Sequence, residues 1–170
     1  MILVKNKYYV ILIKDVVIIS LFVLSTLFSH IYIVPLYYFE PIRIFILLSV
    51  FLTNKNNSII LAVILVFTSS IIVAHPNTLK AFLILTELIL NIYILKYIFD
   101  KISNLFLSVC LSVFISKGIY YTLKWILITQ SLINTELIST PILFQIFNIF
   151  LISFAIYYLF NKSALANVKD

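Results

Sequence analysis

Residues 74–98 read AHPNTLKAFLILTELILNIYILKYI, an apolar segment long enough to cross a bilayer that carries Glu87 and Asn91 near its middle. An ionised carboxylate at that depth costs roughly 2.5–3.5 kcal/mol on insertion scales, so Glu87 needs a partner or a water-filled cavity. Lys80, Glu87 and Asn91 are spaced seven and four residues apart, which predicts that they share one face of a helix. We therefore expect a membrane helix with a single polar stripe.

The composition places the whole chain in the membrane. Of its 170 residues, 64% are hydrophobic and 11% are charged, whereas soluble domains carry about 45–50% apolar and about 25% charged residues. The sequence thus predicts one all-α, polytopic integral membrane domain over residues 1–170. A single cysteine, Cys110, excludes an intramolecular disulfide, and a single glycine excludes a glycine-rich phosphate loop. His30 and His75 have no metal-ligand spacing, so no metal or cofactor is expected.

The apolar runs predict six transmembrane helices. They are expected at about residues 16–38, 42–53, 59–74, 78–99, 105–128 and 142–160. The second run is only about twelve residues long, which indicates a short, tilted or re-entrant helix. Residues 1–15 are interpreted as an interfacial helix or as the start of the first span. Residues 54–58 form the clearest polar loop, with Ser58 as a helix N-cap, and residues 100–104 form another. Pro141 is expected in the first turn of the sixth span.

The distribution of positive charge predicts the topology. If the N-terminus is cytoplasmic, eight lysine and arginine residues fall in cytoplasmic segments and two, Arg43 and Lys80, fall outside. Lys117 and Lys124 lie within the fifth span. This asymmetry is a strong positive-inside signal, so both termini are predicted to be cytoplasmic. It also explains the net charge of +6 without a nucleic-acid partner.

A second polar stripe lies in residues 116–124, SKGIYYTLK. Lys117, Tyr120 or Tyr121, and Lys124 recur at helical spacing and so share a face. Glu87 would lie roughly 12 Å, and Lys117 roughly 16 Å, from the outer ends of two antiparallel, sequence-adjacent helices. We therefore expect the two stripes to meet.

Two interpretations of these stripes remain open. In the first, Glu87 and Lys117 form a structural ion pair, the tyrosines pack, and Lys80 and Lys124 extend their charges to the interface. In the second, the stripes line a cavity open to the outside that binds a small molecule with a flat ring and a carboxylate or phosphate. The candidate binding residues are Glu87, Asn91, Lys117, Tyr121, Lys124, His75, Lys80 and Arg43. For two of them another role is open, since His75 precedes Pro76 in a turn and Arg43 can pair with Glu40.

These motifs resemble the substrate-binding S components of energy-coupling factor (ECF) vitamin transporters. The resemblance covers most of the chain and rests on Pro41-x-Arg43, on His75-Pro76 leading to Lys80 and Glu87-Leu88-x-x-Asn91, and on Ser116-Lys117-x-x-Tyr120-Tyr121-x-x-Lys124. It implies a vitamin-like nutrient captured from outside by the later helices and the first loop.

The resemblance also implies partner proteins, namely a transmembrane coupling subunit driven by two ATPase subunits. The docking signature of the family is an alanine pair four residues apart in the first span, and Ser25 and Ser29 stand there instead. No specificity motif for riboflavin, thiamine, biotin or folate is present.

The sequence therefore predicts a substrate-capturing component of a small-nutrient transporter in the bacterial cytoplasmic membrane, with an anionic or zwitterionic substrate. The alternative is a non-catalytic scaffold or assembly subunit of a cell-envelope complex, in which polar side chains join the helices. A lipid-acting enzyme is a third class, but no reactive side chain stands beside a base, so no enzymatic activity is expected. The arrangement of Glu87, Asn91, Lys117 and Lys124 discriminates the first two, since binding requires a void and a scaffold does not.

Overall fold

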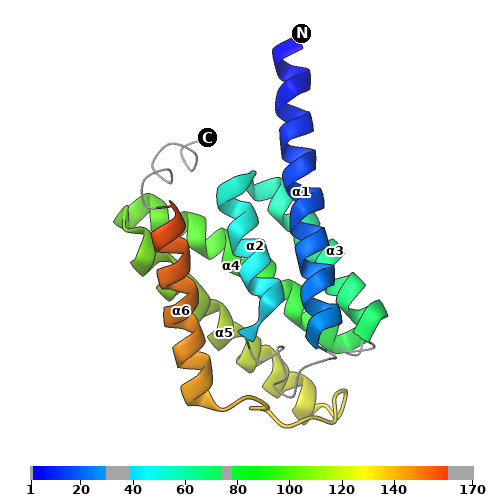
Figure 1. Ribbon diagram of the computed structural model, residues 1–170. Coiled ribbons are helices and arrows are strands. Elements are labelled where there is room, and N and C mark those ends of the chain that lie inside the picture. Colours follow the sequence, from blue (N-terminus) through cyan, green and yellow to red (C-terminus); the bar gives the residue numbers. More distant parts are fainter. Residues whose placement is uncertain (1, 30–38, 74–77, 161–170) are drawn as a thin grey trace.

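The structure is a computed structural model that describes residues 2–29, 39–73 and 78–160. These residues form a bundle of six α-helices with no strand among them, which confirms the all-α prediction (Figure 1). The helices are α1 (Ile2–Ser29), α2 (Pro41–Leu52), α3 (Lys55–Val73), α4 (Thr78–Ile102), α5 (Leu105–Thr129) and α6 (Ile142–Phe160).

Consecutive helices run up and down, so that α1 begins at the same end of the bundle at which α6 ends (Figure 1). The largest helix–helix interface joins α4 to α5, while α1 packs mainly on α2 and α3. The short helix α2 occupies the centre, because it contacts α1, α3, α4 and α6. A twelve-residue apolar helix can hold this position because its neighbours cover it.

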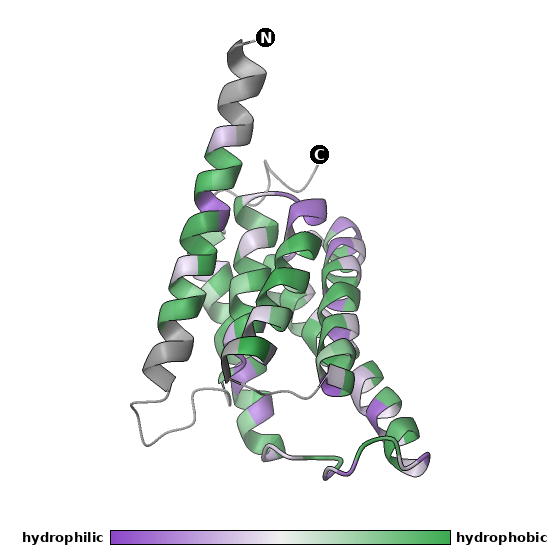
Figure 2. Ribbon diagram, turned by 90° about the vertical axis from the view of Figure 1, so that its right-hand side faces the viewer, coloured by the Kyte–Doolittle hydropathy of each residue, from purple (hydrophilic) through white to green (hydrophobic). Residues whose placement is uncertain are grey.

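Among the described residues, α4, α5 and α6 are long and apolar enough to cross a membrane, whereas α2 and the apolar part of α3 are shorter. These three helices indicate a membrane protein. The burial pattern of α6 agrees with this, because its polar residues Gln145 and Asn148 are buried while Phe147 and Phe154 are more than half exposed. Figure 2 shows that hydrophobic residues predominate along the helices of the bundle. An apolar exterior around a polar interior is costly in water and favourable in lipid.

Two apolar clusters hold the bundle together, and α2 contributes to both. Phe22 and Ile46 belong to one cluster, which joins α1 through α4. Leu47 belongs to the other, which joins α2 and α4 to α5 and α6. Because Ile46 and Leu47 are consecutive in α2, they point to different sides of the helix. The helix therefore links the two halves of the bundle.

The predicted loop at residues 54–58 is wrong, because α3 already begins at Lys55. Asn54 caps this helix, with its Oδ1 accepting from the backbone N–H of Asn57 at 2.8 Å. Ser58, the predicted N-cap, lies inside the helix and donates its hydroxyl to the carbonyl of Asn54 at 2.9 Å. The polar residues of this stretch thus form the capped first turn of a helix and not a loop.

Residues 2–15, interpreted as an interfacial helix or as the start of the first span, belong to the same helix as the described part of that span, because α1 is continuous from Ile2 to Ser29. The charges of Lys14 and Asp15 do not interrupt it, since both have partners at the α2–α3 turn. Lys14 Nζ donates to the carbonyl of Leu52 at 2.8 Å, and the Asp15 carboxylate accepts from Asn57 Nδ2 at 2.6 and 2.7 Å. Residues 30–38 of the predicted first span lie outside the described residues.

The two remaining boundaries differ by a few residues. The loop expected at residues 100–104 is only two residues long, because α4 continues to Ile102. Ser103 takes a positive φ of 53°, and Asn104 caps α5 by accepting from the N–H of Leu107 at 3.1 Å. Pro141 stands immediately before α6, and its carbonyl accepts from Phe144 and Gln145. A tight α4–α5 turn of this kind sets the two polar stripes against each other.

Candidate functional site

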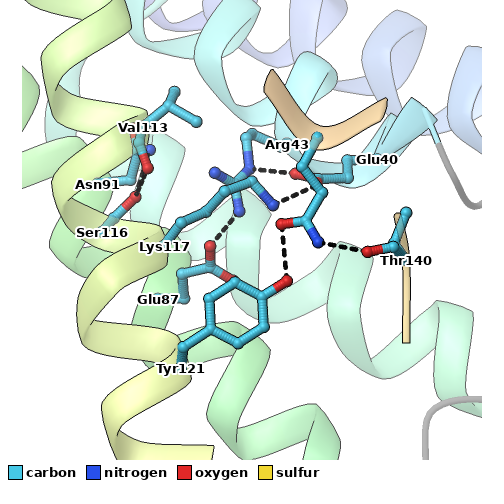
Figure 3. Close-up of polar contacts among 10 residues, drawn as sticks. Glu40, Arg43, Glu87, Asn91, Val113, Ser116, Lys117, Tyr121 and Thr140 are labelled. Carbon is cyan, nitrogen blue, oxygen red and sulfur yellow. Dashed lines mark hydrogen bonds and ion pairs between the residues drawn. The ribbon is translucent and has the colours of Figure 1, made fainter. Parts of the chain in front are cut away.

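Four charged side chains from three parts of the chain meet inside the bundle (Figure 3). Glu40 precedes α2, Arg43 lies in its first turn, Glu87 is in α4 and Lys117 is in α5. Arg43 Nη2 donates to Glu87 Oε1, Lys117 Nζ donates to Glu40 Oε1, and Arg43 Nε lies 2.8 Å from Glu40 Oε2. We call these four residues the ion cluster. Acidic and basic groups alternate in it as Glu87–Arg43–Glu40–Lys117, and the four formal charges cancel.

The four side chains of the ion cluster differ in their exposure to solvent. The side chains of Arg43 and Glu87 are 4% and 6% exposed, whereas those of Lys117 and Glu40 are 13% and 22% exposed. Removing such charges from water is expensive unless each has a partner. The pairing within the cluster meets this requirement, and Glu40 and Lys117 form its more accessible end.

The backbone before α2 places Glu40 and Arg43 in the cluster. Glu40 adopts φ 52° and ψ 55°, the left-handed region, and Pro41 starts the helix at once. A residue other than glycine pays about 1–2 kcal/mol for this conformation. The ion pairs that Glu40 makes to Arg43, three residues on, and to Lys117 offset that cost.

The environment of Glu40 also changes its acidity. Burial by itself raises the pKa of a carboxyl group, because it penalises the charged form. Here the guanidinium of Arg43 and the ammonium of Lys117 outweigh burial and lower the pKa of Glu40 below its ordinary value. The Glu40 carboxyl is therefore ionised at neutral pH.

Hydrogen bonds extend from the cluster region to α6. Tyr121, one turn after Lys117 on α5, donates its hydroxyl to Gln145 Oε1 at 2.6 Å, and Gln145 Nε2 donates to the carbonyl of Thr140 at 2.8 Å. Tyr120 packs edge-on against Tyr121, with ring centroids 5.3 Å apart. These contacts bring α6 and the segment before it to the same end of the bundle.

On α4, one turn beyond Glu87, Asn91 crosses to α5. Its Nδ2 donates to Ser116 Oγ at 2.9 Å, and Ser116 donates in turn to the carbonyl of Val113 at 3.0 Å. Three buried atoms of Asn91 and Arg43 have no hydrogen-bond partner within the described part of the chain: Asn91 Oδ1, Arg43 Nη1 and Arg43 Nε, of which Nε is in ion-pair contact with Glu40. A buried donor and a buried acceptor are thus left with unused capacity.

The sequence prediction for the two polar stripes can be compared with these contacts. Glu87 and Lys117 lie close enough for their charges to interact, but they do not form the direct ion pair of the structural interpretation. Lys117 pairs with Glu40 instead. Arg43 pairs with Glu40, as its alternative role predicted, and also with Glu87. The reason is that Glu40 and the first turn of α2 bring a second acid and a second base to Glu87 and Lys117, and the sequence pattern of a helix does not reveal which other segments lie beside it.

Two further predicted residues, Lys124 and Lys80, make no contact with the ion cluster among the described residues. Lys124 is 1% exposed, and its Nζ donates to the carbonyls of Glu136 and Leu137 at 2.6 and 2.9 Å. It therefore holds the α5–α6 connector, residues 130–141. Lys80 is in the first turn of α4, close enough to Lys124 for their charges to interact. His75 lies outside the described residues.

Two members of this site were not among the predicted residues, Glu40 and Gln145. Glu40 could have been found from its spacing, since a carboxylate three residues before Arg43 at a helix start is placed to pair with it. Gln145 is a lone amide in the apolar run of α6, and a polar group within a membrane helix is a site candidate by default.

The site brings together cationic, anionic and neutral hydrogen-bonding side chains. Within the described residues, no three histidine, cysteine, aspartate or glutamate side chains come together as a metal site. No family of known proteins, no curated protein and no solved structure matches the chain. Its function is therefore argued from the geometry of the ion cluster and its neighbours.

Proposed function

We propose that this chain is the substrate-capturing component of a small-nutrient uptake transporter in the bacterial cytoplasmic membrane. One observation carries the proposal: charged and hydrogen-bonding side chains from α2, α4, α5 and α6 converge toward one end of the bundle. A single ion pair would suffice to join two helices. This convergence is what a small polar ligand needs from a membrane-embedded protein, because intramembrane ionisable groups are costly to maintain.

The charges of the ion cluster favour a zwitterionic substrate over an anionic one. Two carboxylates and two cations already neutralise one another, so a lone anion would leave Glu40 or Glu87 without compensation. A zwitterion can replace one internal partner at each pole and conserve the balance. The partly exposed pair of Glu40 and Lys117 is the place at which such an exchange would start.

The proposal includes six membrane crossings with both termini in the cytoplasm, and an energising partner of a coupling subunit with two ATPases. The two ends of the described bundle can be assigned by cysteine labelling. With Cys110 replaced by alanine, a membrane-impermeant maleimide added to intact cells should modify Asn134→Cys in the connector and spare Asn56→Cys in the first turn of α3. The reverse pattern would invert the topology.

Native mass spectrometry of the protein, gently purified from its own membranes, tests the binding role. We expect a small molecule retained at one-to-one stoichiometry, and its loss in Glu87→Gln, which removes the charge opposite Arg43. Thr86→Ala is the matched control, because Thr86 is exposed and bonds only to the carbonyl of Phe82 in its own helix. Retention that is the same in Glu87→Gln as in the parent would contradict the site assignment.

A second function, a scaffold or assembly subunit of a cell-envelope complex, is favoured by a different observation. Every charge of the ion cluster already has an internal partner, as in a cluster whose only role is to join helices. The same experiment separates the two functions. A stoichiometric partner protein with lipid and no small molecule would decide for the scaffold, whereas a co-purifying ATPase pair would decide for the transporter.

A further inference from the structure

The unused hydrogen-bonding capacity beside the ion cluster carries an inference about the ligand, and it rests on the proposed function. Arg43 Nη1 is a donor without a partner in the described residues, and Asn91 Oδ1 is an acceptor without one. Arg43 and Asn91 are 4% and 1% exposed. A buried polar group left unpaired costs about 1–3 kcal/mol, so both atoms are expected to have an occupant.

Glu87, the partner of Arg43, and Asn91 lie on the same face of α4. Arg43 is bonded to Glu87, and Asn91 stands one helical turn beyond Glu87, about 6 Å along the axis. The next turn of α2 continues along α4 in the same direction, because Ile46 packs in one cluster with Leu88 and Ile92. The bond to Glu87 thus holds the guanidinium of Arg43 one turn of α4 before Asn91.

The other bonds of these side chains fix what each can offer. Arg43 donates Nη2 to Glu87, and its Nε is in ion-pair contact with Glu40 Oε2 at 2.8 Å without a hydrogen-bond partner, so Nη1 is the guanidinium nitrogen with neither kind of contact within the described residues. Asn91 gives Nδ2 to Ser116, which fixes its amide orientation and leaves Oδ1 as an acceptor only. The pair therefore presents one cationic donor and one neutral acceptor.

The charge of Arg43 is already compensated by two carboxylates. A group that binds at Nη1 therefore gains a hydrogen bond without needing to be an anion, and a second anion would be repelled by Glu87. We infer that Arg43 Nη1 and Asn91 Oδ1 recognise a neutral group of the substrate that accepts one hydrogen bond and donates another, as the C=O and N–H of a lactam do.

Arg43 is the only arginine of the chain, which allows a direct test. Protein labelled with ¹⁵N-arginine, in lipid nanodiscs, gives one guanidinium spin system that reports on this site alone. The probes are 2-piperidone, a six-membered lactam, and cyclohexanone, which keeps the ring and the carbonyl but lacks the N–H donor. Cyclohexanone is the more apolar probe, so partition into lipid works against the expected preference.

We expect 2-piperidone to shift the guanidinium signals with half-saturation at about tenfold lower concentration than cyclohexanone, the effect of one lost hydrogen bond that leaves Asn91 Oδ1 unpaired. Thr86→Ala should keep this preference, and Asn91→Leu should lose it. Equal potency of the two probes, or no shift with either, would overturn the inference and would mean that water fills the gap. If Asn91→Leu does not fold, the comparison of 2-piperidone with cyclohexanone in the parent protein still tests the inference.

Failure here is distinguishable from failure of the proposed function. A protein that retains a small molecule in native mass spectrometry but does not discriminate 2-piperidone from cyclohexanone remains a substrate-capturing component without this recognition mode. A protein that retains no small molecule and co-purifies with a stoichiometric partner protein but no ATPase pair loses the proposed function, and this inference with it.

Discussion

Arg43 and Glu87 are 44 residues apart in the sequence and form an ion pair in the interior of the bundle, with Arg43 Nη2 donating to Glu87 Oε1. The pair joins α2 to α4, and through Glu40 and Lys117 it joins both to α5. The central helix of the fold is thus tied to the two long helices by charge as well as by apolar packing.

Removal of Arg43 alone should be among the most destabilising single changes in the chain. Arg43→Met leaves the buried carboxylate of Glu87 unpaired, for which we expect a loss of about 3–5 kcal/mol in the free energy of unfolding. The double variant Arg43→Met/Glu87→Leu should recover most of that loss, because no buried charge is left uncompensated and Glu40 keeps Lys117. Unfolding in mixed micelles with a denaturing detergent measures both values.

The control for this cycle is Thr86→Ala, which should change stability by less than about 0.5 kcal/mol. Strictly additive losses for Arg43→Met and Glu87→Leu would show that the two side chains are not coupled.

The α5–α6 connector should loosen when Lys124 is replaced. Lys124→Met removes both side-chain hydrogen bonds to the carbonyls of Glu136 and Leu137, so the connector should open more often. Cleavage after Glu136 by a glutamate-specific protease should become at least several-fold faster than in the parent. Lys80→Met, which removes a nearby lysine that makes no such bond, is the control, and equal cleavage rates in all three proteins would rule out this role of Lys124.

Stability should depend on the titration of Glu40. Because its pKa in the folded protein is lowered from 4.5, the contribution of its ion pairs is fully present above about pH 4.5 and is lost as the pH falls through the folded value. The difference in unfolding free energy between the parent and Glu40→Gln should therefore be constant from about pH 5 to 7 and shrink below about pH 4.5. A difference that grows on acidification would contradict the sign of this shift.

The attachment of α1 should depend on the contact between Asp15 and Asn57. Both carboxylate oxygens of Asp15 accept from Asn57 Nδ2, a charged hydrogen bond of the kind worth about 1.5–3 kcal/mol. Asp15→Ala should destabilise the protein by about that amount and increase the mobility of a spin label placed on α1. Ser20→Ala is the matched control, since Ser20 is exposed and bonds only to the carbonyl of Val16 in α1. Equal mobility in both variants would mean that apolar contacts alone hold α1.

The outcome for α3 and α1 shows where sequence patterns stop being sufficient. The polar residues 54–58 predict a loop, yet a side-chain cap at Asn54 makes them the first turn of a helix. The charges of Lys14 and Asp15 stand in an apolar run, and their partners at the α2–α3 turn accommodate them within α1. For α3 a side-chain cap decides the structure, and for α1 contacts with residues far along the chain do so. Neither can be inferred from the local composition.

The sequence by itself determined the all-helical class of the protein and the position of its polar stripes. The apolar composition indicates a membrane protein. The spacing of Glu87 with Asn91 and of Lys117 with Tyr121 places each pair on one helical face, because helix geometry is local. Only the tertiary structure decided the partners of these side chains. Glu87 forms an ion pair with Arg43, Lys117 forms one with Glu40, and Lys124 donates a hydrogen bond to the connector. Coulombic and hydrogen-bond energies act over a few ångströms, so they depend on which helices are neighbours, and that is set by how the whole bundle packs.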